Sequence, residues 1–333
     1  MNCRGLIRET SVSCLSLLDL CSNSCYLSAN MKIKIPTVVG IGEVLWDLLP
    51  EGRRLGGAPA NFAFHAAMQG AEACAVSAIG DDTDGRDIIA ELRRKGQSTE
   101  YIATLPQRKT GTVTVELANG IPSYTIHAPA AWDFIPFSAH LERLASEADA
   151  VCFGTLAQRG DLSAATIRSF LSHTRPDCLK IFDVNLRQKF YSAELVDSSL
   201  RQCNFLKISD EEMPVVAELL GFDGSDESVI SALICRYGLK YAVLTRGGEG
   251  SVLSDGRTFT AFSACNFGPK IDTVGCGDSF TAVLTAGLLF GLPPEKAMRH
   301  ASRIAGLVCA SQGAMPEIPD KLRIANLKAE DLP

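Results

Sequence analysis

The stretch Asp272-Thr273-Val274-Gly275-Cys276-Gly277-Asp278-Ser279-Phe280 leads into a nearly apolar run over 281–290, which predicts a buried helix. Gly275 and Gly277 allow consecutive backbone N–H groups to point at one spot, directly before a helix N-terminus that carries partial positive charge. We interpret this stretch as an anion hole, with Asp278 placed to accept a hydroxyl proton beside the bound anion. The alternative is a plain turn in which Asp278 only caps the helix.

Two further glycine clusters carry chemistry. Gly56-Gly57-Ala58-Pro59-Ala60-Asn61 opens a helix, where Asn61 either grips vicinal hydroxyls or is a solvated turn residue. Thr245-Arg246-Gly247-Gly248-Glu249-Gly250 follows a strand end and either admits a nucleotide phosphate or forms a hairpin turn into 251–254. The chain has no G-x-x-x-x-G-K-[ST], G-x-S-x-G or H-E-x-x-H motif, which disfavours Walker-type, serine-hydrolase and zinc-protease functions.

Short β-branched runs alternate with longer amphipathic stretches from Val38 onward, which is typical of βα units around a largely parallel sheet. Strict alternation around Asn119-Gly120 predicts an antiparallel hairpin over 112–126, which either covers a site or decorates a sheet edge. We therefore predict a doubly wound, mostly parallel α/β fold with a small antiparallel β lid. The expected strands are 38–41, 73–79, 150–153, 179–183, 205–208 and 241–245, and the expected helices are 60–69, 85–95, 163–173, 192–202, 210–220 and 225–237.

Composition narrows the class of protein. The chain has 333 residues, 46% hydrophobic and 21% charged, so a sizeable core is expected. A net charge of −6 gives no broad footprint for nucleic acid or for an anionic membrane, and no long apolar span occurs. The 12 cysteines include no C-x-x-C pair, so reduced and mostly buried thiols are expected. None of the five histidines has ligand or triad spacing, and only His65 is expected near the site.

Residues 1–30 differ in composition from the rest of the chain. They are rich in Ser and Cys, and their apolar run over 12–20 is interrupted by polar residues, unlike a signal peptide. Met31 then precedes a strand-like run over 37–41. We interpret residues 1–30 as a translated upstream extension, and the alternative is a targeting segment. We expect the protein to be cytoplasmic.

The three glycine motifs, in this chain order, resemble the two signatures and the nucleotide loop of the ribokinase-like (PfkB) carbohydrate kinases over about 38–319. Within that family, the stretches 42–47, 54–57 and 130–133 most resemble fructokinases. The resemblance implies a kinase domain over 31–333, with lid strands inserted at about 44–56 and 98–130. It also implies ATP and Mg²⁺ as co-substrates and phosphoryl transfer to a sugar hydroxyl, giving fructose 6-phosphate from fructose. The alternatives are a ribokinase, a 2-keto-3-deoxygluconate kinase or a non-catalytic sugar-binding regulator. Dimerisation through the lid is common among such kinases.

The resemblance also implies roles for individual residues. Asp278 is the expected base, and the expected anion-hole amides are those of Gly275, Cys276 and Gly277. The sugar is expected to contact Asp47, Gly57, Asn61, Trp132, Arg159, Asn185 and Arg187. The nucleotide is expected to contact Lys207, Thr245, Gly247, Gly250, Cys309 and Gly313. Glu212 is expected to act on Mg²⁺ through water, and Asp272 lies where relatives bind a monovalent cation such as K⁺.

The chain departs from the family pattern at two positions. Cys276 replaces the usual alanine, and we interpret it as a small space-filling residue, with redox sensitivity as the alternative. Ser209 replaces the usual asparagine, which puts metal ligation there in doubt. The hairpin and Trp132 are expected to close over the sugar, whereas the alternative for the Trp132 ring is ordinary packing.

Overall fold

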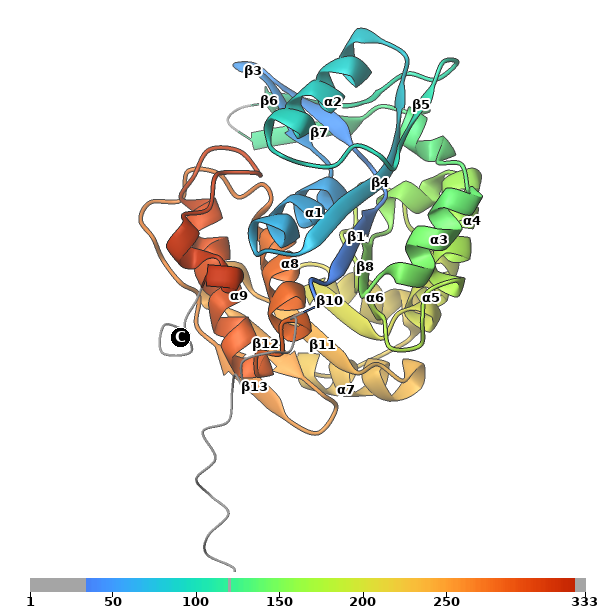
Figure 1. Cartoon of the computed structure of the whole chain (residues 1–333). Coiled ribbons are helices and arrows are strands. Elements are labelled where there is room, and N and C mark those ends of the chain that lie inside the picture. Colours follow the sequence, from blue (N-terminus) through green and yellow to red (C-terminus); the bar gives the residue numbers. More distant parts are fainter. Residues whose placement is uncertain (1–33, 119–120, 327–333) are drawn as a thin grey trace, which may run out of the picture. The chain divides into compact units, whose positions relative to one another are not determined.

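The computed structural model describes residues 34–118 and 121–326 (Figure 1). In this part of the chain, nine strands form one sheet in the order β13-β12-β11-β10-β9-β8-β1-β4-β5. In this order, the seven strands from β11 to β5 are parallel to one another, whereas β12 is antiparallel to both of its neighbours, β11 and β13. Their bounds are β1 Thr37–Ile41, β4 Glu72–Gly80, β5 Ile102–Leu105, β8 Ala150–Phe153, β9 Leu179–Asp183, β10 Phe205–Ser209, β11 Tyr241–Thr245, β12 Ser251–Ser254 and β13 Phe259–Phe262. The predicted doubly wound, mostly parallel sheet is confirmed.

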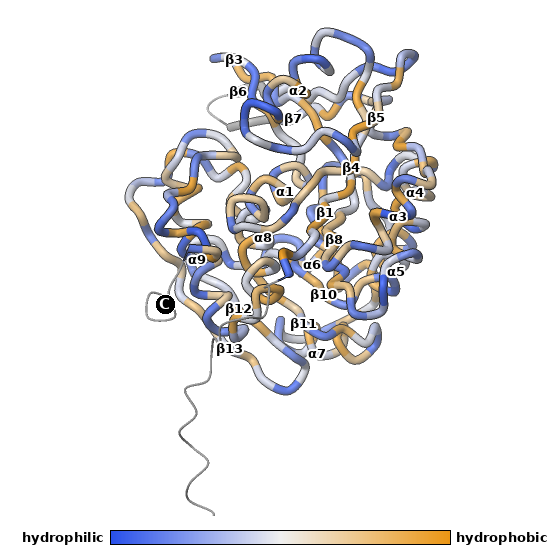
Figure 2. The backbone as a smooth tube through the Cα atoms, viewed as in Figure 1, coloured by the Kyte–Doolittle hydropathy of each residue, from blue (hydrophilic) through white to orange (hydrophobic). Residues whose placement is uncertain are grey.

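Helices cover both faces of the large sheet because alternate residues of each buried strand point to opposite sides. Val38 packs in one apolar cluster with Phe62 and Phe280, and its neighbour Val39 packs in another with Phe170 and Leu200. In Figure 2 the hydrophobic colours gather on central strands such as β10 and β11. The helices of the first side are α1 Ala58–Met68, α8 Cys276–Leu289 and α9 Pro294–Cys309, and those of the second are α3 Ala139–Glu147, α4 Asp161–Ser172, α5 Ala193–Gln202, α6 Met213–Leu220 and α7 Asp226–Tyr237.

Local sequence signals start and end these helices. The side chains of Ser138, Ser192 and Ser225 accept backbone N–H groups at the starts of α3, α5 and α7. Gly221 and Gly238 adopt the left-handed conformation that ends α6 and α7. The short 3₁₀ helices are η1 Ala131–Phe134, η2 Leu156–Arg159, η3 Gly247–Glu249, η4 Asp320–Leu322 and η5 Ile324–Asn326. No helix among the described residues is long and apolar enough to cross a membrane.

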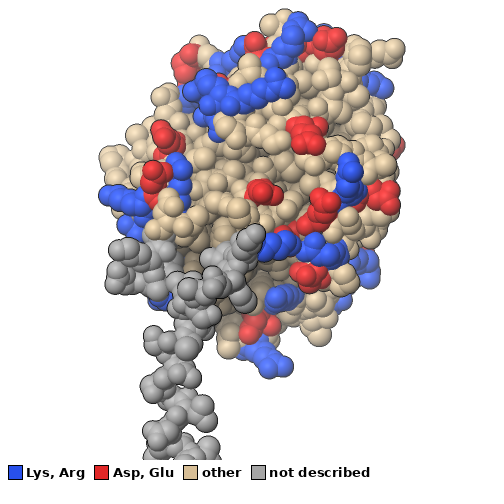
Figure 3. Space-filling model, in the orientation of Figure 1, with Lys and Arg blue, Asp and Glu red and all other residues tan. Residues whose placement is uncertain are grey.

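A second, four-stranded sheet has the order β3-β2-β6-β7. Its strands are β2 Leu45–Leu49, β3 Gly52–Gly56, β6 Gly111–Ala118 and β7 Ile121–Ile126. The predicted hairpin is β6–β7, with Asn119-Gly120 outside the described residues. Helix α2, Thr83–Arg94, packs beside this sheet, where basic side chains gather at the top of Figure 3. Within the expected lid segment 98–130, β5 differs from the expectation because it pairs with β4 in the large sheet.

The order of strands around β1 determines where ligands can bind. β1 lies between β4 and β8, so the chain builds the sheet outward from β1 in both directions. In open α/β sheets a crevice forms at the carboxyl ends of the strands at such a switch point. Glu43 follows β1, Gly154 follows β8, and Asp183 ends β9, and these three residues line one small cavity together with Asp278. The interpretation of residues 1–30 concerns a segment outside the described residues.

Candidate active site

Asp278 lies in the first turn of α8 and faces α1. Its Oδ2 accepts a hydrogen bond of 2.7 Å from Nδ2 of Asn61, although 217 residues separate the two in sequence. Asn61 is buried, and its own Oδ1 has no hydrogen-bond partner within residues 34–118 and 121–326. The amide therefore orients the carboxylate and keeps one acceptor for a ligand that reaches this point.

The electrostatic surroundings of Asp278 favour a base that works near neutral pH. Burial and the nearby Asp183 carboxylate raise the pKa of Asp278 to about 6, although the Asn61 hydrogen bond and the charges of Lys207 and Arg187 oppose this rise. Burial likewise raises the pKa of Glu43 to about 7, and Asp278 adds to that rise. Two carboxyl groups thus lie close together and cannot both be charged without cost.

The turn before α8 requires glycine at Gly275. Gly275 has φ of 79°, and a Cβ there would lie 2.7 Å from Cα of Ala314. The segment that carries Ala314 is itself held, because Nε2 of His65 donates to the Ala314 carbonyl at 2.8 Å. Burial lowers the pKa of His65 to about 4, so this histidine stays neutral and acts as a structural donor rather than as a catalyst.

A buried ion pair lies under the start of α8. Nζ of Lys207 is 3.0 Å from Oδ1 of Asp183, and the Asp183 carboxylate also accepts the Thr281 hydroxyl at 3.0 Å. Burial opposes the charged form of Lys207, but the Asp183 and Glu212 carboxylates raise its pKa above the ordinary value. A Cβ at Gly277 would lie 3.3 Å from Nζ of Lys207, so this ammonium group lies directly against the turn at the start of α8.

The small sheet supplies Asp47 to the same region. Burial raises the pKa of Asp47 to about 6, while Arg187 and Arg54 oppose the rise. Gly57 has φ of 113°, and a Cβ there would collide with the Glu43 carbonyl oxygen, so only glycine fits. Arg187 is exposed and its charge acts on Asp47, Glu43 and Asp278.

Asn185 lines the cavity beside Asp278 and has φ of 46°, a conformation that a non-glycine residue adopts only where its surroundings hold it. It belongs to the segment that follows β9, as does Arg187. The structure thus gathers Asp278, Asn61, Asp47, Asn185 and Arg187 near one edge of the sheet.

Trp132 and Arg159 form a separate arrangement. Trp132 is fully buried in the main apolar core, so the expectation that its ring stacks on a sugar is wrong, and ordinary packing holds. The Arg159 guanidinium lies over the Trp132 ring at 4.0 Å, and its Nε is 2.8 Å from the Asp133 carboxylate. Its Nη1 is buried and finds no acceptor among the described residues.

The expected nucleotide residues lie on three segments: Lys207 is in β10, Cys309 and Gly313 lie at and after the end of α9, and the other three lie at and after the end of β11. Thr245 ends β11, Gly247 begins η3 and Gly250 follows η3, and both glycines have positive φ. Gly248 adjoins Lys270 of the loop before α8, because a Cβ at Gly248 would lie 3.5 Å from Nζ of Lys270.

Asp272 links that loop to the segment after α9. Its Oδ2 accepts the Gly313 N–H at 3.2 Å and an Arg54 N–H at 2.8 Å, which also ties the small sheet to this loop. Val274 N–H donates to Oδ1 of Asp272 at 3.0 Å. The carboxylate is therefore already well supplied with donors from the protein.

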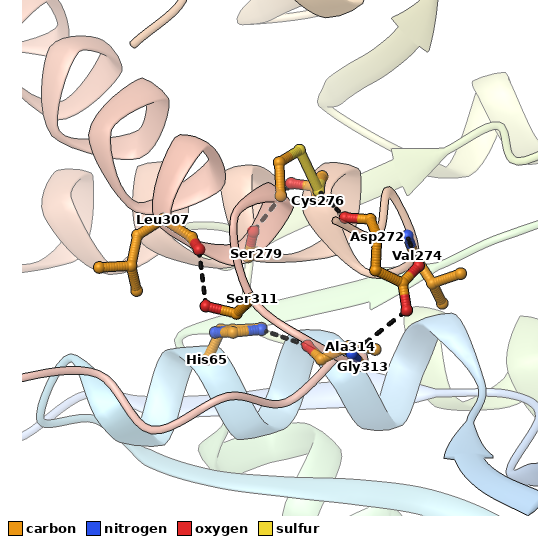
Figure 4. The surroundings of a disulfide bond; sticks show 10 residues. His65, Asp272, Val274, Cys276, Ser279, Leu307, Ser311, Gly313 and Ala314 are labelled. Carbon is orange, nitrogen blue, oxygen red and sulfur yellow. Dashed lines mark hydrogen bonds between the residues drawn. A yellow bond between two sulfur atoms is a disulfide. The ribbon is translucent and has the colours of Figure 1, made fainter. Parts of the chain in front are cut away.

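The expectation of reduced thiols is wrong for one pair, because Cys276 and Cys309 form a disulfide (Figure 4). The two residues are 33 positions apart in the sequence, so the short C-x-x-C spacing cannot indicate that they pair. The pairing of α8 with α9 brings the two residues together.

Comparison with known proteins identifies the family. The family model described as pfkB family carbohydrate kinase matches residues 51–321. The chain belongs to the pfkB family of carbohydrate kinases. It is 30% identical to a fructokinase of Escherichia coli over 312 residues, which cover 86% of this chain and 98% of that protein.

Solved structures agree with this assignment. The structure of an uncharacterised sugar kinase of Pyrococcus horikoshii in complex with ATP is 26% identical, with a TM-score of 0.73, and the match covers 89% of this chain and 98% of that one. The structure of a fructokinase of Xylella fastidiosa with bound ATP has a TM-score of 0.77 at 20% identity, covering 87% and 96%, and supports the fold alone.

For a pfkB kinase, the donors around Glu212 are suited to Mg²⁺. Each Glu212 carboxylate oxygen accepts one backbone N–H at 2.9 Å, from Leu186 and from Ser209, and each keeps further acceptor capacity. The Ser209 hydroxyl accepts the Glu212 N–H at 3.2 Å, so Ser209 has a local structural role. No cluster of three or more His, Cys, Asp or Glu side chains that would hold a metal occurs among the described residues. The remaining acceptor capacity of the Glu212 carboxylate fits an ion that is held through its own waters.

Sequence reasoning assigns no role to two residues of the site. Glu43 lies within the stretch 42–47, and a charged residue two positions after a buried strand is a signal for this edge of the sheet. Arg54 lies within the stretch 54–57, and its ion pair with Asp272 joins positions 218 residues apart, which no local pattern reveals.

Proposed function

We propose that this pfkB kinase is an ATP-dependent fructokinase that forms fructose 6-phosphate. The observation that carries the proposal is the Asp278 carboxylate, which Asn61 orients at the start of α8 and whose pKa is raised to about 6. A base with that pKa is deprotonated at neutral pH and accepts a hydroxyl proton readily. The E. coli relative that is 30% identical is itself a fructokinase, which supports the choice of sugar.

Phosphoryl transfer requires the protein mainly to position groups and to stabilise charge. In the proposed mechanism, Asp47, Gly57, Asn61 and Asn185 hold the sugar, and Asp278 removes the proton of the attacking hydroxyl. The amides of Gly275, Cys276 and Gly277 stabilise the charge of the transferred group, with Lys207 and Arg187 as cations nearby.

The nucleotide and the ions are assigned to neighbouring segments. Thr245, Gly247, Gly250, Cys309 and Gly313 line the proposed nucleotide site. Bound Mg²⁺ would neutralise phosphate charge, and Glu212 would hold it through water. Asp272 is the proposed neighbour of a K⁺ ion.

The small sheet is the proposed lid, which would exclude water from the transfer. Its outer strands β3 and β7 pair with no further strand among the described residues and form the proposed dimer interface, although Gln188 already donates to the Tyr124 carbonyl of β7. We place the enzyme in the cytoplasm, where sugar and ATP are both available.

A second candidate substrate follows from Arg159. Its buried Nη1 donor has no hydrogen-bond partner in the part of the chain that the structure describes, and a carboxylate would satisfy it. This observation favours a sugar acid such as 2-keto-3-deoxygluconate over a neutral ribose as the alternative substrate.

Steady-state assays of ADP formation with fructose, ribose, glucose and 2-keto-3-deoxygluconate, with and without K⁺, test the proposal. Fructose is expected to give the highest kcat/KM. The Asp278→Asn variant is expected to lose transfer while binding fructose in calorimetry. Preference for the sugar acid would replace the fructokinase assignment, and turnover of no sugar by the wild type would favour a sugar-binding regulator.

A further inference from the structure

The disulfide connects the two helices that border the anion hole. Cys276 is the first residue of α8 and Cys309 is the last residue of α9, and their Cα atoms are 5.8 Å apart. Figure 4 shows the disulfide beside Asp272 and Ser279, where α8 begins and α9 ends. Both cysteines are only partly buried, so small thiols and disulfides can reach them.

Backbone hydrogen bonds join the same two places. The Cys309 carbonyl accepts the N–H groups of Ile271 at 2.9 Å and Asp272 at 3.3 Å. At the other end of this loop, the Cys276 N–H donates to the Thr273 carbonyl at 3.3 Å. The disulfide therefore closes a loop, 271–276, whose first residues are already attached to Cys309.

The other described cysteines are poorly suited to redox chemistry or lie elsewhere. Burial raises the pKa of Cys74, Cys178 and Cys203 to about 12, which keeps these thiols protonated and inert. Cys235 is exposed on α7, and Cys265 is partly exposed in the loop after β13. Cys152 lines the cavity beside Asp278, but it is buried, and burial raises the pKa of its thiol. Among the described cysteines, the bridged pair is thus the partly exposed one at the proposed catalytic turn.

We propose that Cys276 and Cys309 are a reversible redox pair, and that the disulfide form is the low-activity state of the kinase. This inference rests on the proposed function, which makes the Cys276 amide an anion-hole donor. One cysteine thiolate attacks a low-molecular-weight disulfide and releases one thiol, and the second cysteine then attacks the mixed disulfide and releases the other. Two protein thiols are oxidised to one disulfide while one small disulfide is reduced to two thiols.

The direction of the effect follows from the Cys276 N–H. In the disulfide form this donor points at Thr273, and the bridge to Cys309 holds the residue that carries it. A donor engaged by a protein carbonyl is not free for a phosphoryl oxygen, and the loss of one such donor commonly costs about 10²–10³ in kcat. Reduction removes the bridge, so the loop 271–276 can turn this amide toward the ligand. Alanine, the usual residue here in the resembling kinases, cannot form such a switch.

The test compares full-length enzyme equilibrated with glutathione disulfide or with dithiothreitol, after removal of the reagent. Oxidised wild type is expected to have a kcat at least about tenfold below that of the reduced form, with the sugar KM within about twofold. The difference should vanish in Cys276→Ala and in Cys309→Ser, and should persist in the matched control Cys235→Ser. Alkylation followed by peptide mass spectrometry should show 276 linked to 309 in the oxidised sample.

Several results would overturn the proposal. These are equal kcat in the two wild-type forms, a redox difference that survives in Cys276→Ala, or a bridge from Cys309 to Cys265. ATP affinity by calorimetry gives a second measure that needs no turnover, and reduction is expected to tighten it at least about threefold. If no sugar is phosphorylated in either state, the proposed function fails, and equal ATP affinities would then refute the redox pair as well.

Discussion

The Asp278→Asn substitution is expected to abolish phosphoryl transfer and at the same time to stabilise the fold. The catalytic loss follows from removal of the proposed base, and loss of such a group commonly costs about 10²–10⁴ in rate. The gain in stability follows because burial and the Asp183 carboxylate disfavour a charged Asp278 in the folded protein. An asparagine of the same shape carries no charge, and its side-chain oxygen can still accept the hydrogen bond from Asn61.

The size of the gain depends on pH. The pKa of Asp278 rises from 3.8 to about 6 on folding, and a pKa change of one pH unit corresponds to about 1.4 kcal/mol. Because the folded-state pKa is raised, the folded wild type binds more protons than the unfolded chain between these values. Its stability relative to the variant is therefore complete below pH 3.8 and is lost as pH rises through 6. The variant should gain about 3 kcal/mol at pH 8 and roughly half of that at pH 5.

Urea unfolding of both proteins at pH 5 and pH 8, followed by far-ultraviolet circular dichroism, measures this gain. Asp183→Asn is the matched control, because it also converts a buried carboxylate into an amide near the same place. There the change leaves Lys207 buried without its 3.0 Å partner, so a loss of about 3–5 kcal/mol is expected. The two variants should thus move in opposite directions.

An Asp278→Asn variant that unfolds at lower urea than the wild type at pH 8 would refute this account of the base. A gain of equal size at pH 5 and pH 8 would also refute it, since the effect would then not come from titration of the carboxyl group.

Two further predictions concern Asn61 and Trp132. The Asn61→Ala substitution removes the 2.7 Å hydrogen bond that lowers the pKa of Asp278. The apparent pKa of the acidic limb in the pH profile of kcat/KM should therefore rise by about one pH unit. An unchanged apparent pKa would mean that Asn61 does not act through the base. The Trp132→Phe substitution should lower the free energy of unfolding by about 1–2 kcal/mol. It should leave the KM for the sugar within about twofold, because the ring is fully buried. A large rise in KM would show that Trp132 contacts the sugar directly.

The central part of the fold could be predicted because its strands are short runs of apolar residues, and the apolar residues of each run indicate by themselves that the strand is buried. The expected strands 150–153 and 179–183 coincide with β8 and β9. The strands β2 and β3 lie within the segment 44–56, where the family resemblance predicts lid strands, but their own residues do not indicate them, because each has five residues and neither pattern alternates regularly. Helix α9 was missed as well, since it begins directly after Pro293 and its amphipathic run was not separated from the apolar run before it.

The site was less predictable than the fold, because its groups meet only in three dimensions. The motifs indicated Asp278 and Asn61 separately, but their hydrogen bond spans 217 residues. Trp132 was misjudged for the same reason, since a tryptophan beside a hairpin has the same local sequence whether its ring faces solvent or core. Whether a side chain is buried depends on how distant segments pack around it, so the sequence next to that residue does not determine its burial.

The raised pKa values favour binding of the polyanion that the proposed function places at this site. The pKa is raised to about 7 for Glu43 and to about 6 for Asp47 and Asp278. At neutral pH the three groups therefore carry less negative charge than three exposed carboxylates would, which weakens the repulsion of an approaching phosphate. A bound phosphate raises all three pKa values further by the same Coulomb effect, and a protonated Asp278 cannot act as a base. The Lys207 ammonium, 3.3 Å from where a Cβ would lie on Gly277, opposes that rise, so in the proposed reaction this buried cation keeps the base deprotonated while it stabilises the transferred charge.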